Sequence, residues 1–268
     1  MKRLFGLVCI AIFTMALLTA CGDTTPTSNI TSANETTQGS GAQPPLTEPT
    51  PEPEPEPTPT PSQPTAQTLS PGILISNQPG LEILEFGYSL VGTRNLFLRY
   101  SIILRNYNDQ LARFPSFRIT AFSSDGSILG TTRSVRGDLN PGETMVWSSQ
   151  AFSVEERPDR VEVDVEPMEA RNWSTNFQQH QPLVIQNVNE NARGNILGQI
   201  VNPNDHGYSL VWAVVIYRDA EGMLLGGQST SVSNVPANGT VAFDISGLSD
   251  DRAASFEVFT WIEGHIIS

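Results

Sequence analysis

Residues 100–150, YSIILRNYNDQLARFPSFRITAFSSDGSILGTTRSVRGDLNPGETMVWSSQ, and residues 196–246, ILGQIVNPNDHGYSLVWAVVIYRDAEGMLLGGQSTSVSNVPANGTVAFDIS, decide the fold, because one can be laid over the other. Turn and core positions keep a separation of 96 residues, with small gaps around 110–122 and near the second turn. The pairs with this offset are Asn106 and Asn202, Asp109 and Asp205, Gly126 and Gly222, Gly130 and Gly226, Thr144 and Thr240, and Trp147 and Phe243. Such an offset indicates a duplicated module, and the alternative is chance similarity between common β signals.

The local pattern predicts β-strands throughout both stretches. LFLRYSIILRN (96–106) and YSLVWAVVIY (208–217) are rich in β-branched and aromatic residues and lie next to turn formers. Asp125-Gly126 and Glu221-Gly222 separate strand-like runs, as hairpin turns do. We therefore expect an all-β protein with two tandem immunoglobulin-like β-sandwiches, each of about seven short strands. The expected modules span residues 72–167 and 182–268, with an intermodule linker at 168–181.

The first 20 residues have the pattern of an export signal. Lys2 and Arg3 precede an apolar run that is too short for a spanning helix and ends in small residues. An uncleaved N-terminal anchor is the alternative. Leu18-Thr19-Ala20-Cys21 resembles the lipobox of bacterial lipoproteins, and this resemblance implies cleavage before Cys21 and acylation of its sulfur and its new amine. Cys9 would be lost with the leader, so Cys21 would be the only thiol left, and lipidation would account for it.

Residues 21–71 form a predicted stalk. They are first rich in Thr, Ser, Asn and Gly and then contain proline at nearly every second position, in PPLTEPTPEPEPEPTPTPSQPT. Such a segment buries too little apolar surface to offset its ordering entropy, so we expect a disordered spacer with extended polyproline II character. A proline-rich ligand for an aromatic groove is the alternative reading.

Both modules resemble the FxLYD family of bacterial extracytoplasmic domains. The second module carries Val215-Ile216-Tyr217-Arg218-Asp219 followed by the turn at Gly222, and the first carries Ala121-Phe122-Ser123-Ser124-Asp125-Gly126 and later Pro141-Gly142. The match is partial, because Arg218 separates Tyr217 from Asp219 and Asn238-Gly239 replaces Pro-Gly in the second module. The resemblance implies a β-sandwich at the cell surface, and it implies nothing about activity, because the family has no established chemistry to carry over.

The charge balance and the lysine content exclude several functions. The chain has a formal net charge of −13, which becomes −15 when Lys2 and Arg3 leave with the leader. Such a chain repels phosphate backbones, so nucleic acid is not an expected partner. Lys2 is the only lysine, so the processed chain would have no Schiff-base lysine and no phosphate-binding lysine of the Walker type.

No catalytic residue, metal ligand or cofactor is expected. His180, His206 and His265 lie far from one another in sequence or lack metal-site spacing. Asn202-Pro203-Asn204-Asp205-His206-Gly207 is similar to the start of a calcium loop, but Ala213 stands where the bidentate Glu is expected, so a polar turn is the better reading. Gly226-Gly227 is read as a turn or bulge.

Aromatic residues are the remaining candidates for ligand binding. Trp173 lies between the modules, where it could stack on a sugar or a partner, or could pin one module to the other. Tyr107 and Tyr208 lie near equivalent polar loops and are weaker candidates. Trp147 and Trp212 are expected in the core.

These observations predict a lipid-anchored protein on the extracytoplasmic side of a bacterial membrane. Its duplicated modules would act as a non-catalytic binding or scaffolding arm for an unidentified envelope protein or polysaccharide. The alternative is a carbohydrate-binding module of a wall- or polysaccharide-associated complex, which predicts exposed coplanar aromatics on one sheet face. A third reading, as an enzyme or a solute receptor, lacks the expected alternation of strands and helices.

Overall fold

The computed structural model describes residues 67–70, 72–248 and 250–267, all of which belong to the compact unit Pro59–Ser268. The expected signal peptide, Cys21 and the stalk up to residue 66 lie outside the described residues. The described chain is all-β, as predicted, and its single helical element is the one-turn 3-10 helix η1, Ala170–Asn172. Strand β1, Gln67–Ser70, falls at the end of the segment assigned to the stalk.

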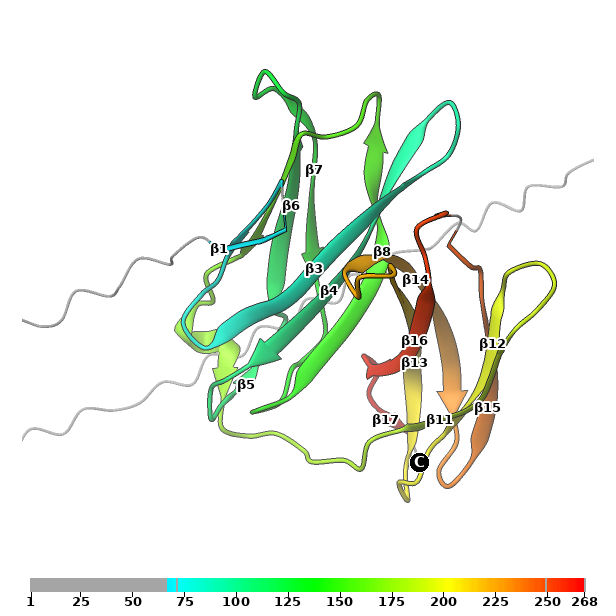
Figure 1. Ribbon diagram of the computed structural model, residues 1–268. Helices are drawn as coiled ribbons and strands as arrows, with labels where there is room; N and C mark the ends of the chain where they lie inside the picture. The colour runs from blue at the N-terminus through cyan, green and yellow to red at the C-terminus, as the bar shows by residue number, and fades with distance from the viewer. Residues whose placement is uncertain (1–66, 71, 249, 268) are drawn as a thin grey trace, which may run out of the picture. The chain divides into compact units, whose positions relative to one another are not determined.

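The strands form two pairs of sheets (Figure 1). The first sheet pair consists of the five-stranded sheet β1-β2-β9-β6-β7 and the three-stranded sheet β3-β4-β8. Its further strands are β2 (Ile73–Ser76), β3 (Leu81–Val91), β4 (Leu96–Asn106), β6 (Ser116–Phe122), β7 (Ile128–Val135), β8 (Thr144–Val154) and β9 (Arg160–Val165). A small sheet of β5 (Leu111–Ala112) and β10 (Trp173–Ser174) lies beside it.

The second sheet pair repeats this order. It consists of the sheet β11-β12-β15 and the sheet β14-β13-β16, with β17 also paired to β13. Its strands are β11 (Val184–Glu190), β12 (Ile196–Val201), β13 (Gly207–Arg218), β14 (Leu224–Val235), β15 (Thr240–Ile245), β16 (Ser255–Ile262) and β17 (Ile266–Ile267). Thus β3-β4-β8 corresponds to β11-β12-β15, and β9-β6-β7 corresponds to β16-β13-β14. The immunoglobulin-like assignment of the two modules stays a prediction.

A buried asparagine closes the same loop in each sheet pair. The Asn106 side-chain amide donates to the carbonyls of Gln110 (2.8 Å), Leu139 (3.0 Å) and Asn140 (3.2 Å). In the second pair, the Asn202 amide donates to His206 (2.8 Å) and Pro236 (2.9 Å), and both asparagines are fully buried. Buried polar groups need such partners, so these two residues fix the loops at one end of each pair.

The two sheet pairs are joined by a face-to-face contact that we call the inter-pair interface. Figure 1 shows β3, β4 and β8 between β6 and β7 on one side and β13, β14 and β16 on the other. Side chains from both pairs share one core, in which Ile103 and Val146 of the first pair join Val214, Ile216 and Trp261 of the second. The T-shaped pair of Trp147 and Trp212, with ring centroids 5.0 Å apart, also joins the two pairs. Trp147 is buried as predicted, whereas Trp212 is partly buried against this core.

Glycine and serine let the backbones approach closely at this interface. A Cβ added at Gly87 would lie 1.8 Å from the Leu224 carbonyl oxygen, and one added at Gly226 would lie 2.5 Å from the Arg99 carbonyl oxygen. Ser89 Oγ accepts a hydrogen bond from the Gly226 N–H at 3.1 Å. Gly226 and Gly227 therefore lie within β14 as close-contact positions. The β13–β14 register shifts beside them, between Ile216 and Arg218, in agreement with the bulge expected from sequence and not with a turn.

Serine hydroxyls and ion pairs supply further polar contacts at the interface. Ser229 Oγ donates to the Ser148 carbonyl at 2.9 Å, and Ser148 Oγ lies 2.8 Å from Ser101 Oγ. At the margin, Arg218 pairs with Glu85 at 2.6 Å and with Glu257 at 2.8 Å. These hydrogen bonds raise the pKa of Arg218, so its guanidinium stays charged.

The outer face of the five-stranded sheet differs from its counterpart in the second pair. Arg118 of β6 corresponds to Val214 of β13. The cross-strand neighbours of Arg118 are Asp164 and Arg133. Those of Val214 are Phe259 and Ser229. In the first pair, Glu166 accepts hydrogen bonds from Arg118 and Arg133, and Ser116 Oγ donates to it at 2.8 Å. Burial alone would raise the pKa of Glu166, but these hydrogen bonds outweigh burial and lower it. The face that is apolar and covered in the second pair is thus charged and exposed in the first.

The first prediction concerns the close approach at Gly87. Gly87→Val places a side chain against the Leu224 carbonyl, so we expect the free energy of unfolding to fall by about 2 kcal/mol or more. Urea denaturation measures this change. Thr240→Val, at an exposed strand position, is the matched control and should change stability by less than about 0.5 kcal/mol. Equal effects of the two substitutions would contradict the close packing described here.

The second prediction concerns the loop that follows β15. The Asp250 carboxylate accepts hydrogen bonds from the Arg252 guanidinium, one of them at 2.7 Å, and Arg252 also reaches the Tyr88 carbonyl at 3.4 Å in the first pair. The bonds from Arg252 are the main cause that lowers the pKa of Asp250 to about 2 from its ordinary 3.8. Because the folded pKa is depressed, this contribution to stability is present above pH 3.8 and is lost as the pH falls toward 2. Asp250→Asn should therefore reduce the loss of stability over this pH range, which urea denaturation at several pH values would show, and an unchanged pH profile would contradict the assignment.

Candidate functional site

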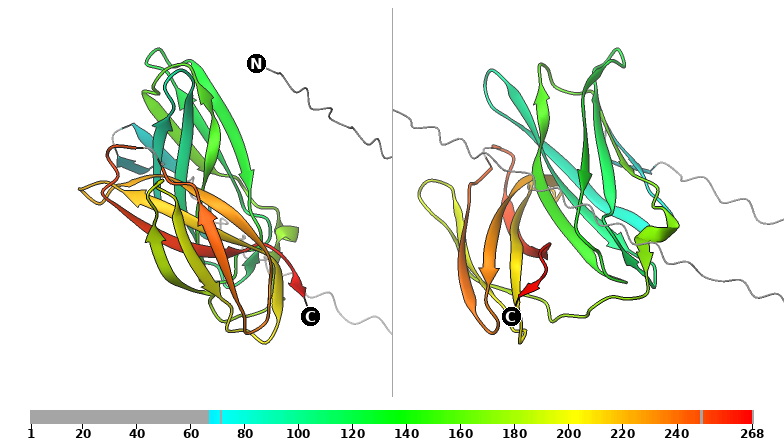
Figure 2. Two further views of the ribbon diagram at one scale, coloured as in Figure 1. Left: turned by 90° about the vertical axis from the view of Figure 1, so that its right-hand side faces the viewer. Right: turned by 180° about the vertical axis from the view of Figure 1, so that it is seen from behind.

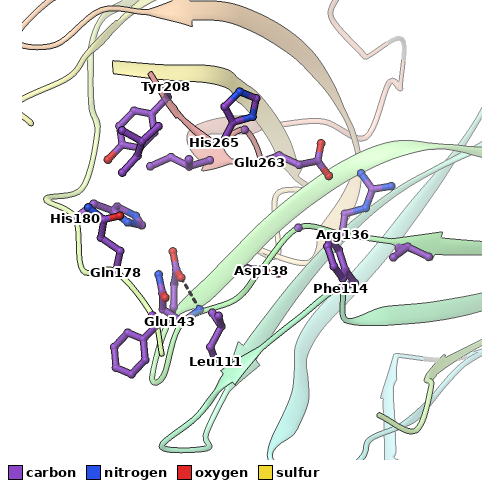
Figure 3. Close-up of a pocket in the computed structure, with 17 residues that line it drawn as sticks. Leu111, Phe114, Arg136, Asp138, Glu143, Gln178, His180, Tyr208, Glu263 and His265 are labelled. Carbon is purple, nitrogen blue, oxygen red and sulfur yellow. Dashed lines mark hydrogen bonds between the residues drawn. The ribbon is translucent and has the colours of Figure 1, made fainter. Parts of the chain in front are cut away.

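A pocket of about 560 Å³ lies at the end of the inter-pair interface (Figure 3). The pocket has three walls. The first sheet pair forms one wall with residues at the ends of β5 and β7 and in the segments that follow them. The segment between β10 and β11 forms the second, and residues in and next to β13, β16 and β17 form the third. Figure 2 (right) shows the segment between β10 and β11 passing along this end of both sheet pairs. The residues used below are Leu111, Phe114, Val135, Arg136, Asp138, Glu143, Phe177, His180, Tyr208, Glu263, His265 and Ile266.

Exposed apolar side chains line part of this pocket. Phe114 is 63% exposed, and Val135 and Ile266 are each 39% exposed. Phe114 also has a φ of 53°, a left-handed conformation that is costly for a residue with a Cβ. A strained and exposed aromatic residue at a pocket is a feature of binding sites, because water is a poor neighbour for its ring.

Three carboxylates line the pocket, and each has a partner within the fold. Burial raises the pKa of Asp138, while Arg113 and the Phe114 backbone oppose this rise. Glu143 Oε2 accepts the Asn140 backbone N–H at 2.9 Å, and Glu263 Oε2 accepts the indole N–H of Trp212 at 2.5 Å. These contacts give the carboxylates fixed positions on the two sides of the pocket.

One arginine lines the same pocket. The guanidinium of Arg136 lies over the Trp147 ring, 4.1 Å from its centroid. This cation–π contact holds Arg136 at the wall that the first sheet pair contributes. The pocket therefore offers both apolar surface and fixed charges of both signs.

The three histidines, which are separate in sequence, lie near the start of β13. Two of them contact Tyr208 and the third contacts its neighbour Ser209. His206 Nε2 lies 3.0 Å from the Tyr208 hydroxyl and its Nδ1 lies 2.9 Å from Asp205. The His180 ring packs edge-on against Tyr208 with centroids 6.1 Å apart, and His265 Nδ1 lies 3.4 Å from Ser209 Oγ. In the described residues, no group of three or more His, Cys, Asp or Glu side chains is arranged to hold a metal ion. The arrangement positions Tyr208 and gives the pocket hydrogen-bonding groups.

The structure separates the three aromatic residues that the sequence singled out. Tyr208 lines the pocket but is buried, whereas Tyr107 is 54% exposed in a loop with the Arg105 guanidinium 5.0 Å from its ring centroid. Trp173 is half-buried, packs against the core of the first sheet pair and pairs with Ala112. Cys21, the predicted lipidation site, lies outside the described residues.

Sequence reasoning missed the pocket residues His180, His265 and Phe114. His265 reaches Ser209, the neighbour of Tyr208, because β17 pairs with the start of β13, where Ile266 lies opposite Tyr208. His180 is placed by the segment between the sheet pairs, where Gln181 exchanges hydrogen bonds with Asn204. Neither contact follows from spacing along the chain. Phe114 has no such signal either, because its exposure is visible only in the structure.

Comparisons with known proteins add little to this geometry. No family model matches the chain, and no curated protein does. Among solved structures, it is similar to the C-terminal globular domain of an oligosaccharyltransferase from Pyrococcus abyssi, with 7% identity and a TM-score of 0.19. That match covers 70% of this chain and 48% of the other, so the chain spans about half the length of that structure. Separately, the described residues include no helix long and apolar enough to cross a membrane.

The third prediction concerns Tyr208. Burial is the main cause that raises its pKa above the ordinary value of 10.0, and the charge of Asp205 adds to the rise. The measurement is the difference in phenolate absorbance between the chain and its Tyr208→Phe variant, recorded over a range of pH. The Tyr208 phenolate should form at a higher pH in the folded protein than in urea. The same midpoint in both conditions would contradict the burial of the Tyr208 hydroxyl.

Proposed function

We propose that this chain is a lipid-anchored protein of the bacterial envelope and that residues 72–267, which we call the arm, bind a partner outside the membrane without catalysis. In this proposal Cys21 carries the lipid, the Pro-rich segment is a spacer, and the pocket beside Phe114 is part of the contact with an envelope protein. The observation that carries the proposal is the pocket itself, because exposed apolar side chains and fixed charges from both sheet pairs meet there.

The inter-pair interface supports a role as one rigid arm. Its core contains side chains from both pairs, and its backbones approach at Gly87 and Gly226 without room for a Cβ. A contact of this kind holds the two walls of the pocket in a fixed arrangement, so a partner would meet a preformed surface.

The titratable groups of the pocket are engaged with the fold itself. Glu143 and Glu263 accept hydrogen bonds from Asn140 and Trp212, and Tyr208 is held by His206. Groups held in this way are suited to recognition, since each presents a fixed charge or hydrogen-bonding atom to a neighbour.

A carbohydrate ligand is the second candidate, and Phe114 and Phe177 at the pocket are the observation in its favour. Sugar rings stack on aromatic side chains, and carboxylates accept hydrogen bonds from sugar hydroxyl groups. Among the described residues, however, the large aromatic side chains exposed to solvent are Tyr107 and Phe114, which lie in loops and not on a sheet face. This placement favours a protein partner.

The fourth prediction tests this function in the envelope. The full chain, carrying a photo-cross-linking amino acid in place of Phe114, should yield one discrete cross-linked envelope protein after irradiation of living cells. The same substitution at Thr240, exposed on the outer face of β15, is the matched control and should yield none. A photo-cross-linker is needed because the processed chain would contain no lysine for amine-directed reagents.

The anchor is tested in the same cells. Cys21→Ser should release the chain from the membrane fraction and abolish the cross-link, because the arm no longer stays near its partner. Cross-linked polysaccharide in place of protein would support the carbohydrate function, and equal labelling from Phe114 and Thr240 would contradict a specific contact.

A further inference from the structure

The two sheet pairs differ at one edge. In the first pair, β2 runs parallel to β9, with Ile73 facing Val161 and Ile75 facing Val163. In the second pair, β16 corresponds to β9 but pairs only with β13 in the part of the chain that the structure describes. The segment that would follow β2 by 96 residues is residues 169–172, and it forms η1 beside the first pair. The edge of β16 therefore lacks the strand that its counterpart has.

The backbone of β16 directs N–H groups to this edge that pair with no other described residue. In β9, the Val161 N–H donates to the Gly72 carbonyl at 2.7 Å, which is the first bond to the β2 segment. The cross-strand register matches Val161 to Phe256 and Val163 to Val258. The Glu263 N–H donates to the Leu210 carbonyl of β13. In an antiparallel ladder the N–H groups of successive residues point alternately toward and away from the neighbouring strand. The N–H groups of Phe256, Val258 and Thr260, which alternate with those that face β13, therefore point away from it.

The side chains at this edge are also less covered than their counterparts. Val161 and Val163 are fully buried in the first pair, where β2 lies beside β9 in the same sheet. Phe256 and Val258 are only half-buried, although both pack against the second core. A strand with apolar residues at alternate positions would complete their burial, as Ile73 and Ile75 do in the first pair.

The open edge continues into a groove. Thr260, Trp261 and Ile262 form one side of a second pocket of about 430 Å³, and residues 177–183 and 140–144 contribute the remainder. Phe177, His180 and Ile262 line both this pocket and the pocket beside Phe114. A segment that runs parallel to β16 from Phe256 therefore proceeds toward the candidate site.

We infer that β16 binds an extended segment of the partner protein as an added parallel strand. This inference rests on the proposed function and specifies how the partner attaches. The bound segment has aliphatic residues at alternate positions, because the occupied site of the first pair accepts Ile73-Leu74-Ile75-Ser76 in this geometry. Main-chain hydrogen bonds supply affinity in such an addition, and the alternate side chains supply specificity.

A peptide tests this inference directly. The probe is the chain's own residues 72–78, Gly-Ile-Leu-Ile-Ser-Asn-Gln, labelled with a fluorophore, and the binding protein is the full chain in detergent. We expect saturable binding by fluorescence anisotropy, and loss of binding when proline replaces Leu74 of the peptide, since its N–H is then missing from the ladder. Absence of saturable binding would overturn the inference.

Variants of Val258 supply the controls on the protein. Val258→Pro removes an N–H that points to the open edge and should weaken peptide binding by at least about tenfold, whereas Val258→Thr keeps this N–H and should bind within about twofold of the parent chain. Val258→Lys, which places a charge at the edge, is the second test if the proline variant does not fold. Binding that is unchanged in both Val258→Pro and Val258→Lys would overturn the inference.

The outcomes separate this inference from the proposed function. A partner that still cross-links at Phe114 in the Val258→Pro chain would leave the binding function standing and remove the strand addition. Concentration-dependent dimers of the parent chain that disappear in Val258→Pro, measured by sedimentation, would show that a second copy occupies the edge and would overturn the assignment to a partner protein. Loss of the cross-link in Val258→Pro, with folding and the peptide result as expected, would support both.

Discussion

The close approach of β14 to β3 and β4 is the constraint on which the rest of the arm depends. Gly87, Gly226 and Gly227 have no space for a side chain, and Ser89 fills the remaining gap with a hydrogen bond to the backbone. Because the second sheet pair covers the outer face of β4, this strand is buried on both faces over most of its length. The same contact places Trp147 against Trp212 and brings the residues after β7 near those beside β17, which creates the pocket.

The two sheet pairs share a strand order but not a surface, and the difference explains where the stack of sheets ends. Val214 and Phe259 face the interface in the second pair, whereas Arg118 and Asp164 occupy the matching positions of the first. Desolvating these charges would cost more than an apolar contact returns, so the outer face of the five-stranded sheet does not offer the docking surface that its counterpart offers. Terminal repeats of stacked proteins carry polar outer faces for the same reason.

The sequence predicted the strands and the loops well because their signals are local. Alternating apolar residues, hairpin turns at Gly126 and Gly222, and the offset between Asn106 and Asn202 all correspond to features of the structure. The interface was not predicted, because serine and glycine in a strand resemble exposed or turn positions until another backbone lies against them. At Gly226-Gly227 the sequence indicated a turn or bulge, but the backbones of β3 and β4 that lie against Gly226 were not foreseen for this reason. The convergence of His180, His206 and His265 likewise depends on the path between the sheet pairs and has no local signal.

Differences between the repeats, and not their common fold, create the surfaces available for binding. In the first pair the chain forms β2 before it enters β3, and this strand completes the edge beside β9. Before the second pair, the matching residues form η1 and are followed by β10, which pairs with β5, so they are used to close the first pair. The chain then reaches β11 through residues 175–183, where Gln181 binds Asn204. One segment thus closes the first pair and contributes Phe177 and His180 to the pocket. Among the described residues it also leaves the second edge of β16 without a paired strand, so the open edge and the pocket follow from a single departure from the repeat.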